Sequence, residues 1–242
     1  MPRIIKTRGI CLYARPLRET SKIVIFYTEQ FGKLALIAKG ARKTSSKFGS
    51  SLEPFVFSEL IFYKTEPKSV YTLSETSLID NWSSLKFANK YFYANQIVEL
   101  ILRAVNFEDP NQKLFRLLHS ALNTLNSAKS DSNFSSLVTA YFLEAISVLG
   151  YQPELRRCVI CRNSKSIGFS IKKGGVLCKD HIYLDNEIYD IEQIKPLKYL
   201  LKAPLSKTLK TSIPQSTAKL VEDYVTYHLE KIKLHSLRFS LK

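Results

Sequence analysis

Residues 22–39 of the chain read KIVIFYTEQFGKLALIAK, and this stretch decides the fold. Its two halves, residues 22–28 and 33–39, are rich in the β-branched, aromatic and aliphatic side chains that are typical of short β-strands. The connection between them, at residues 29–32, ends in Gly32, which suits the positive φ of a tight turn. The stretch therefore predicts a β-hairpin.

Three further runs on either side of the hairpin have the same character, at residues 4–14, 54–63 and 70–79. Five short strands within about 80 residues, with no long helical period among them, predict a small sheet closed into a barrel. The OB-fold is the five-stranded candidate. A small SH3-like barrel is the alternative with a similar pattern.

The segment between the third and fourth runs, residues 39–51, is a basic loop. It contains two glycines, four serines, one threonine and four cations, and no carboxylate occurs before Glu53. OB barrels bind single strands through a cationic groove and through aromatic faces on which bases stack. We predict that the four cations of the loop bind DNA: Lys39, Arg42, Lys43 and Lys47. A solvated turn, whose cations serve only solubility, is the alternative interpretation.

Four aromatic side chains of the predicted barrel are candidates for base stacking: Tyr13, Tyr27, Phe31 and Tyr63. For each of them taken singly, a place in the core or at the barrel end is the better-founded expectation. The sequence does not decide which of them stacks.

The charge balance of the chain is unusual. Lys and Arg total 36 against 21 for Asp and Glu, which gives a formal net charge of +15 over 242 residues. A surplus of this size attracts polyanions, so DNA, RNA or an acidic protein segment is the expected partner. The hydrophobic content of 45% is ordinary for a folded globular protein.

No stretch of the sequence is typical of a membrane protein. The most apolar runs, such as 23–27 and 34–38, are far shorter than the roughly 20 residues that cross a bilayer. The basic N-terminus at residues 1–6 is not followed by an apolar segment, so we expect no secretory signal. We therefore expect no membrane partner and a cytoplasmic location. In such a reducing compartment, cysteines are metal ligands or free thiols before they are disulfides.

Three cysteines and a histidine have the spacing of a zinc ribbon. Cys158 and Cys161 form a Cys-x-x-Cys pair, and after sixteen further residues Cys178 and His181 form a second pair, preceded by two glycines. Each pair supplies two ligands for one edge of the tetrahedron that Zn²⁺ prefers. We predict one structural Zn²⁺ held by these four residues. Four protein ligands leave no position for water, so the predicted site is not catalytic.

Three other interpretations of these cysteines stay open. In one, Cys158 and Cys161 form a redox dithiol, although they do not lie on the strand-to-helix turn of a βαβ unit. In another they form disulfides, which a reducing compartment disfavours. In the third the spacing arises by chance. Cys11 stands alone in an apolar run, so we expect it to be a small buried hydrophobic residue.

The pattern changes from strand to helix after about residue 81. Apolar residues recur at three- and four-residue steps in three segments up to Gly150, again at 188–202, and again after Pro214. The expected fold class is therefore α+β, in four parts. These are an OB-fold nucleic-acid-binding barrel at 1–80, a helical domain at 81–150, a zinc ribbon at 151–185, and C-terminal helices at 186–242 that pack on the helical domain.

The sequence offers no recognisable catalytic group. Its carboxylates are scattered, and it contains neither Gly-x-x-x-x-Gly-Lys-Ser/Thr nor Gly-x-Gly-x-x-Gly. His119, His228 and His235 lack acidic neighbours in the sequence, and His228 lies on an apolar helical face where a core role is expected. We therefore expect a binding protein rather than an enzyme.

The order of these parts, together with several short motifs, resembles the RecO family of bacterial recombination mediators. The resemblance covers nearly the whole chain. It departs from the family pattern at His181, where a fourth cysteine is common. The motifs are residues 7–12, 19–24, 28–32, 38–43 and 52–55, the two ligand pairs with Gly174-Gly175, and residues 227–229 and 236–239.

The resemblance implies a function. Proteins of the RecO family bind single- and double-stranded DNA and anneal complementary strands. With RecR they help to load RecA onto single strands coated by SSB, whose acidic C-terminal tail they recognise. For this chain the resemblance implies the same partners, a place in the bacterial nucleoid and no catalysis. An RNA-binding or ribosome-associated protein with the same OB and zinc-ribbon elements is the alternative.

Overall fold

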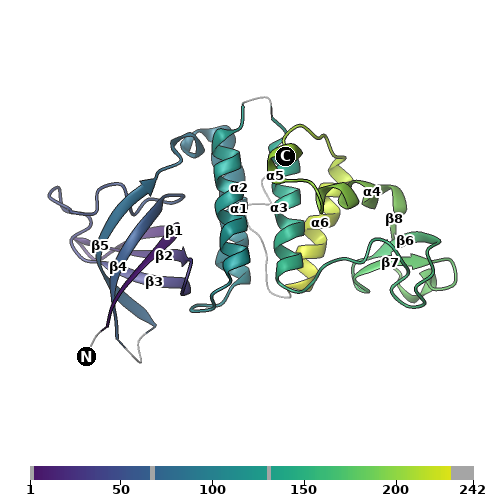
Figure 1. Cartoon of the computed structure of the whole chain (residues 1–242), viewed down its shortest axis with the longest axis horizontal. Coiled ribbons are helices and arrows are strands. Elements are labelled where there is room, and N and C mark those ends of the chain that lie inside the picture. Colours follow the sequence, from purple (N-terminus) through teal and green to yellow (C-terminus); the bar gives the residue numbers. More distant parts are fainter. Residues whose placement is uncertain (1–2, 66–68, 130–131, 230–242) are drawn as a thin grey trace. The chain divides into compact units, whose positions relative to one another are not determined.

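The computed structural model describes residues 3–65, 69–129 and 132–229 (Figure 1). Its contacts divide the chain into two compact units, Met1–Asn126 and Ser127–Lys242. The first unit contains a β-barrel followed by helices, and the second combines helices with a small sheet. This mixture confirms the predicted α+β class.

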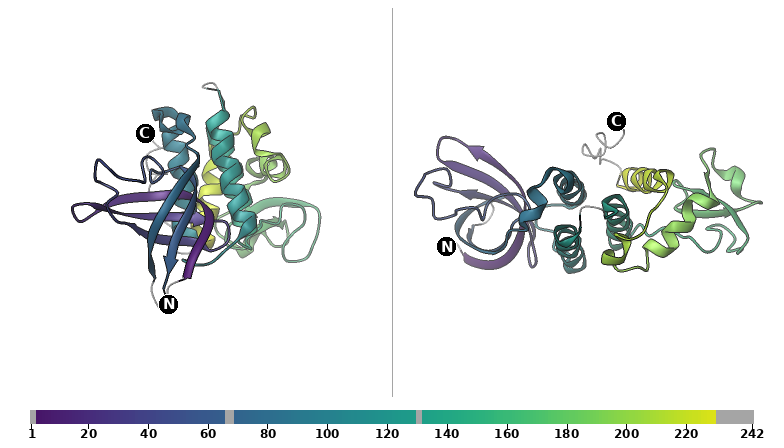
Figure 2. Two further views of the ribbon diagram at one scale, coloured as in Figure 1. Left: turned by 60° about the vertical axis from the view of Figure 1, so that its left-hand side comes forward. Right: turned by 90° about the horizontal axis from the view of Figure 1, so that it is seen from above.

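The first unit begins with five β-strands that curve round into a closed barrel (Figure 2). Their order around the barrel is β1-β2-β3-β5-β4, and β4 pairs back onto β1. Every pairing is antiparallel except that of β3 with β5. A closed five-stranded barrel of this kind confirms the predicted OB-fold. The strands are β1 (Arg3–Leu17), β2 (Ser21–Thr28), β3 (Gly32–Ala38), β4 (Phe57–Lys64) and β5 (Val70–Asp80).

Two strand boundaries differ from the prediction by three residues, and the others by one residue at most. The strand predicted from residue 54 begins at Phe57. Before it, Phe55 has a φ of 68°, and its N–H donates to the carbonyl of Cys11 at 2.8 Å. This left-handed residue turns the backbone out of line, so part of the apolar run is a turn. β1 is longer than predicted and ends at Leu17, because it pairs with β2 up to the connecting turn.

Inside the barrel, alternate side chains of the strands meet in one apolar core. Cys11 is part of this core and is fully buried, as predicted, and burial raises the pKa of its thiol to about 12. A thiol in this environment is a packing group rather than a nucleophile. The buried core comprises Cys11, Val24, Phe26, Leu34, Leu36, Ala38, Phe48, Leu52, Leu60, Phe62, Tyr71 and Leu73.

Two helices complete the first unit. They are α1 (Ala88–Ala104), preceded by the 3₁₀ turn η1 (Ser83–Lys86), and α2 (Gln112–Ser127). Aromatic contacts join α2 to the barrel, since the ring of Phe115 lies 6.1 Å from that of Tyr27 on β2. The outer surface of the barrel around Tyr27 is therefore covered by α2.

The β2–β3 hairpin also anchors these helices. Lys33 is buried, and its Nζ donates to the carbonyl of Leu102 near the C-terminal end of α1 at 2.6 Å. At the turn, Gly32 has a φ of 66°, and a Cβ there would lie 2.3 Å from the carbonyl oxygen of Asp109. Gly32 therefore serves the tight turn that the sequence predicts and also the close approach of the loop before α2.

The second unit combines helices with a three-stranded sheet of order β7-β6-β8. α3 and α6 lie side by side in both views (Figures 1 and 2). The ring of Phe169 on β6 lies 5.8 Å from that of Tyr224 on α6, which joins the sheet to the helices. The elements are α3 (Phe134–Val148), β6 (Ser166–Ser170), β7 (Gly175–Cys178), η2 (Ile182–Leu184), β8 (Tyr189–Asp190), α4 (Ile191–Leu200), α5 (Leu205–Thr208) and α6 (Gln215–His228).

The boundary between the two units falls between α2 and α3, inside the helical domain expected at 81–150. The four-part division stays a prediction. The family-like segment 236–239, and the part of 186–242 that follows Leu229, lie outside the described residues. Across the residues that the structure describes, no helix combines the length and apolar character that crossing a membrane requires.

Candidate metal centre and nucleic-acid surface

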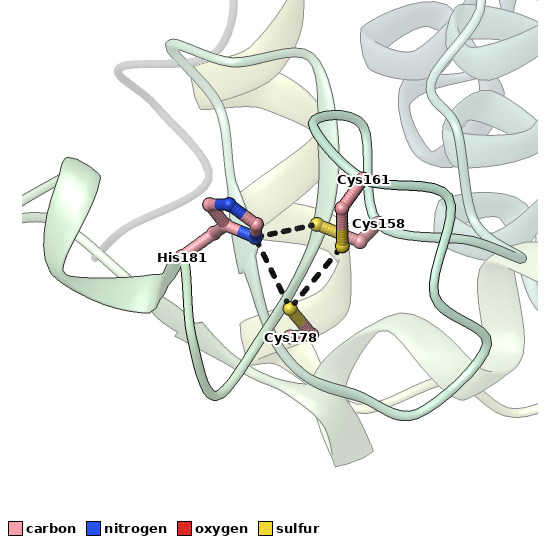
Figure 3. A group of neighbouring side chains, drawn as sticks. All are labelled: Cys158, Cys161, Cys178 and His181. Atoms are coloured by element: carbon pink, nitrogen blue, oxygen red, sulfur yellow. Dashed lines mark hydrogen bonds between the residues drawn. The ribbon is translucent and has the colours of Figure 1, made fainter.

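The four predicted zinc ligands come together at one end of the small sheet of the second unit (Figure 3). Their ligand atoms all lie within 4.8 Å of one another. The Cys161 and Cys178 sulfurs are 3.7 Å apart, and Nδ1 of His181 lies 3.3 Å from the Cys178 sulfur and 3.8 Å from the Cys158 sulfur. Two segments that are far apart in the sequence thus supply one compact donor set.

These separations match a tetrahedral zinc site. With Zn–S bonds of about 2.3 Å and Zn–N bonds of about 2.0 Å, a tetrahedron separates two sulfurs by about 3.8 Å and a sulfur from a nitrogen by about 3.5 Å. Three of the six separations, Cys161–Cys178, Cys178–His181 and Cys158–His181, lie within a few tenths of an ångström of these values. His181 faces the three sulfurs with Nδ1 (Figure 3), so the residue that departs from the four-cysteine pattern still completes the donor set.

Each ligand pair lies on a tight hydrogen-bonded turn. In the first, the N–H of Arg162 donates to the carbonyl of Cys158, and the N–H of Cys158 donates to the carbonyl of Asn163, both at 2.9 Å. In the second, the N–H of His181 donates to the carbonyl of Cys178 at 3.0 Å. These turns fix the spacing of the ligands within each pair, which is what the sequence spacing predicts.

The two glycines before the second turn have separate roles. Gly174 has a φ of 75° and makes the turn from β6 into β7. A Cβ on Gly175 would lie 2.6 Å from the carbonyl oxygen of Glu154 and 2.6 Å from Cγ1 of Val159. Gly175 therefore lets the segment that carries Cys158 approach β7 closely.

The electrostatics of the cluster favour a bound cation. Burial opposes ionisation of Cys158, but hydrogen bonds from backbone N–H groups of Ile160, Cys161 and Cys178 outweigh it and lower the pKa of this thiol to about 6. Burial and the neighbouring Cys161 and Cys158 raise the pKa of Cys178. A Zn²⁺ ion between the sulfurs would resolve this conflict, because it stabilises thiolates directly.

The ribbon has little apolar packing of its own. Its buried cluster comprises Cys158, Leu177 and Cys178, with Val159 and Ile188 packed against it. Most of this cluster is the ligand set itself. The residues fit a structural zinc ion, which would supply the folding free energy that so small a core lacks.

Cations surround the metal cluster on the ribbon. All of them are exposed, and among them Arg162 forms an ion pair of 3.3 Å with Glu154. Their positive charge would favour the excess negative charge that three thiolates on one Zn²⁺ would carry. The cations are Arg156, Arg157, Arg162, Lys165, Lys172, Lys173 and Lys179.

The basic loop lies at the end of the barrel where β1 turns into β2. The N–H of Arg42 donates to the carbonyl of Thr20 at 2.9 Å, and its guanidinium donates to the carbonyl of Arg18, also at 2.9 Å. These bonds hold the loop against the β1–β2 turn, on which the exposed Arg18 lies. All four predicted DNA-binding residues, Lys39, Arg42, Lys43 and Lys47, are exposed.

The structure separates the four aromatic candidates. Tyr27 is fully buried, with its hydroxyl donating to the carbonyl of Asn111 at 3.4 Å. Phe31 is partly buried and packs edge-on against Phe62 in the barrel. Tyr13 and Tyr63, in contrast, face solvent.

Two of the histidines singled out in the sequence pack among aromatic rings. Nε2 of His228 lies 2.8 Å from the carbonyl oxygen of Ile171, and its ring packs on Tyr224. The ring of His119 lies edge-on to those of Phe57 and Trp82. Burial lowers the pKa of both imidazoles, so both are neutral packing groups near pH 7.

Comparison with known proteins covers both units. The family model described as Recombination protein O N terminal matches residues 1–82, and that described as Recombination protein O C terminal matches residues 88–238. The chain belongs to the RecO family. The resemblance read from the sequence motifs is confirmed, and the barrel and the zinc ribbon are therefore parts of a RecO-family protein.

Individual RecO proteins are similar along almost their full length. The DNA repair protein RecO of Caldanaerobacter subterraneus subsp. tengcongensis is 31% identical over 248 residues, which cover 99% of this chain and 98% of that relative. DNA repair protein RecO of Desulforamulus reducens is also 31% identical, over 98% of this chain and 94% of the relative. DNA repair protein RecO of Bifidobacterium longum is 30% identical, over 97% and 98%.

Proposed function

We propose that this chain is a recombination mediator that binds single- and double-stranded DNA and anneals complementary strands. The observation that carries the proposal is the exposed basic loop, held by Arg42 on the end of an OB barrel in a RecO-family chain. Lys39, Arg42, Lys43 and Lys47 are its phosphate contacts. Annealing needs two strands whose phosphates repel each other to come together, and a net charge of +15 favours that approach.

The protein partners follow from family membership. In this proposal the chain acts with RecR to load RecA onto single strands coated by SSB, and it recognises the acidic C-terminal tail of SSB. The positive net charge supports an acidic partner segment. The function is binding without catalysis, and the Cys158, Cys161, Cys178 and His181 site is structural because four protein ligands fill a tetrahedral zinc shell.

DNA affinity as a function of salt tests the electrostatic part of the proposal. Each neutralised phosphate releases counterions, so binding through about four cations predicts a steep loss of affinity as salt rises from 50 to 200 mM. Replacing Lys39, Arg42, Lys43 and Lys47 together by Ala should weaken binding to single and double strands and flatten this dependence. Affinity that hardly changes with salt contradicts the proposal.

A matched variant controls for net charge. Four lysines are exposed on α4, α5 and the turn between them, and replacing them by Ala removes the same charge from the second unit; they are Lys195, Lys198, Lys202 and Lys207. The loop variant should lose much more affinity than this control. An equal loss of affinity in both variants would mean that DNA binding depends on the overall charge of the chain rather than on the loop. Preference for RNA over DNA of the same sequence would favour an RNA-binding function instead.

A further inference from the structure

The outer face of β1, β2 and β3 carries a row of apolar side chains beside the basic loop. Val24 and Leu36 point into the core, so their neighbours in each strand point outward. The pairing register places Tyr13 opposite Ile25. It also places Ile23 between Arg15 on β1 and Ile37 on β3. The outward row comprises Tyr13 and Arg15 on β1, Ile23 and Ile25 on β2, and Ile37 on β3.

Tyr13 is the aromatic residue of this face. Its side chain is 44% exposed, whereas the three isoleucines beside it are partly buried and form a floor. A bulge between Cys11 and Tyr13 shifts the register of β1 at this point. The face therefore presents one accessible ring beside a partly buried apolar surface, an arrangement that suits stacking of a planar base.

Positive charge continues from this face toward the basic loop. Arg15 lies two residues along the same strand, opposite Ile23, and Lys39 follows directly on the end of β3. Among the described residues, neither Arg15, Lys39 nor Lys43 takes part in an ion pair. Their charges are free to meet phosphates beside the apolar floor.

Tyr63, the other exposed aromatic candidate, has different surroundings. It is 38% exposed on β4, where its partners across the strands are Ile4 and Thr72. On this face Lys6 is neutralised by Glu59 at 2.8 Å. Lys64, which pairs with Glu108 at 2.9 Å, and Arg3 opposite it alternate with Tyr63 and Ile4 and so lie on the other face of the strands. Exposure alone does not separate Tyr13 from Tyr63, but free positive charge does.

We propose that Tyr13, on the apolar floor of Ile23, Ile25 and Ile37, stacks on an unpaired base and gives the barrel its contact specific to single strands. The inference rests on the proposed function, because the basic loop supplies the phosphate contacts. A duplex keeps its base faces stacked on one another, so it can use the cations but not the ring. Tyr13 thus distinguishes single from double strands, whereas the loop binds both.

The test compares Tyr13→Leu with Tyr13→Phe. Leucine keeps an apolar side chain and removes the ring, so single-strand affinity should fall by about 5- to 150-fold, the range for losing one base stack. Duplex affinity should stay within twofold of wild type. Tyr13→Phe keeps the ring and should bind like wild type, and Tyr63→Leu should leave both affinities unchanged. Unchanged single-strand binding by Tyr13→Leu, or an equal loss for both DNA forms, overturns the inference.

A second variant tests the contact without removing the ring. The chain has one tryptophan, Trp82, which is buried, so a Tyr13→Trp variant adds a single exposed indole. Its fluorescence should be quenched by single-stranded DNA and not by duplex, and absence of quenching by bound single strands contradicts stacking. If the loop variant alone loses DNA binding, the proposed function stands and the stacking inference fails. If the loop variant binds normally, the proposed function itself fails.

Discussion

The barrel and the zinc ribbon are both small β-sheets, but they contain very different amounts of apolar core. Among the described residues, twelve buried side chains pack in the barrel cluster, whereas the ribbon cluster has three, two of which are cysteines. Burial of each large apolar side chain contributes roughly 1.5–3 kcal/mol. The barrel can therefore be held by its core, whereas the ribbon, apart from Phe169 and Val176 on its strands, has little apolar packing and would gain stability from a bound zinc ion.

This difference shows how each sheet of a basic chain can leave its outer surface available to a polyanion. A metal bound by the Cys158–His181 cluster would take the place of a larger core in the ribbon, which can then be small and carry exposed cations such as Lys165 and Lys179. The barrel uses its interior for stability and leaves Tyr13 and the basic loop on its outside. Folding around a metal and folding around an apolar core should therefore respond differently to mutation.

The largest expected effect is the loss of a zinc ligand. Cys178→Ser should release zinc and unfold the ribbon, because structural zinc contributes on the order of 10 kcal/mol to folding. Hydrogen exchange followed by mass spectrometry should show lost protection in β6 and β7 and unchanged protection in the barrel strands. Cys11→Ala is the matched control and should keep its zinc. Equal loss of protection in both regions would contradict separate modes of folding.

A cavity in the barrel core should destabilise the barrel and leave the zinc site of the ribbon unchanged. Phe62 is fully buried, and Phe62→Ala should lower the free energy of unfolding by about 3–5 kcal/mol. Chemical denaturation with zinc analysis of the folded protein measures both consequences. Zinc content should stay at that of wild type. Loss of zinc from folded Phe62→Ala protein would show that the barrel core supports the ribbon directly.

The fourth ligand gives a smaller and more specific effect. His181→Ala removes one donor and should weaken zinc affinity by more than about 100-fold, since changes outside the ligand shell already cost 10- to 100-fold. His181→Cys should restore tight binding with a four-cysteine set. Competition with a zinc chelator measures both affinities. Wild-type affinity in His181→Ala would exclude His181 as a ligand.

The smallest effect is a pH dependence in the second unit. Burial raises the pKa of Glu222 on α6 from 4.5 to about 7. The folded state therefore disfavours the charged carboxylate, and stability falls as pH rises from about 4.5 through about 7. Glu222→Gln should raise the free energy of unfolding by about 1 kcal/mol at pH 8, after allowance for solvent screening, and leave it unchanged at pH 4. Thermal midpoints at the two pH values measure this, and an equal shift at both contradicts it.

The sequence predicted those parts of the fold that are determined by residues close together in the chain. Five runs of strand-typical composition, including the hairpin at residues 22–39, predicted the barrel, and the spacing from Cys158 to His181 predicted the donor set. The start of β4 was predicted wrongly because the run from residue 54 is apolar whether it is a strand or a turn. Only the long-range bond from Phe55 to Cys11 decides between them.

Other features depend on contacts between distant segments. Lys33 on β3 has the sequence pattern of a solvated lysine, yet it is buried against the end of α1. Arg42 folds back onto the β1–β2 turn, where its guanidinium donates to the backbone carbonyl of Arg18, and the sequence gives no signal for this contact. Tyr13 could not be separated from Tyr27 by sequence, because both are strand tyrosines and only the helix packed on Tyr27 makes the difference.

The central claim, that the basic loop on the barrel carries the DNA-handling function of this RecO-family chain, is tested most directly by annealing of complementary strands coated with SSB. The account predicts that the wild-type chain and the Lys195, Lys198, Lys202 and Lys207 control variant anneal them. It predicts that the variant with Lys39, Arg42, Lys43 and Lys47 replaced by Ala does not, although it remains folded and retains zinc. Annealing by this loop variant at the wild-type rate would contradict the account.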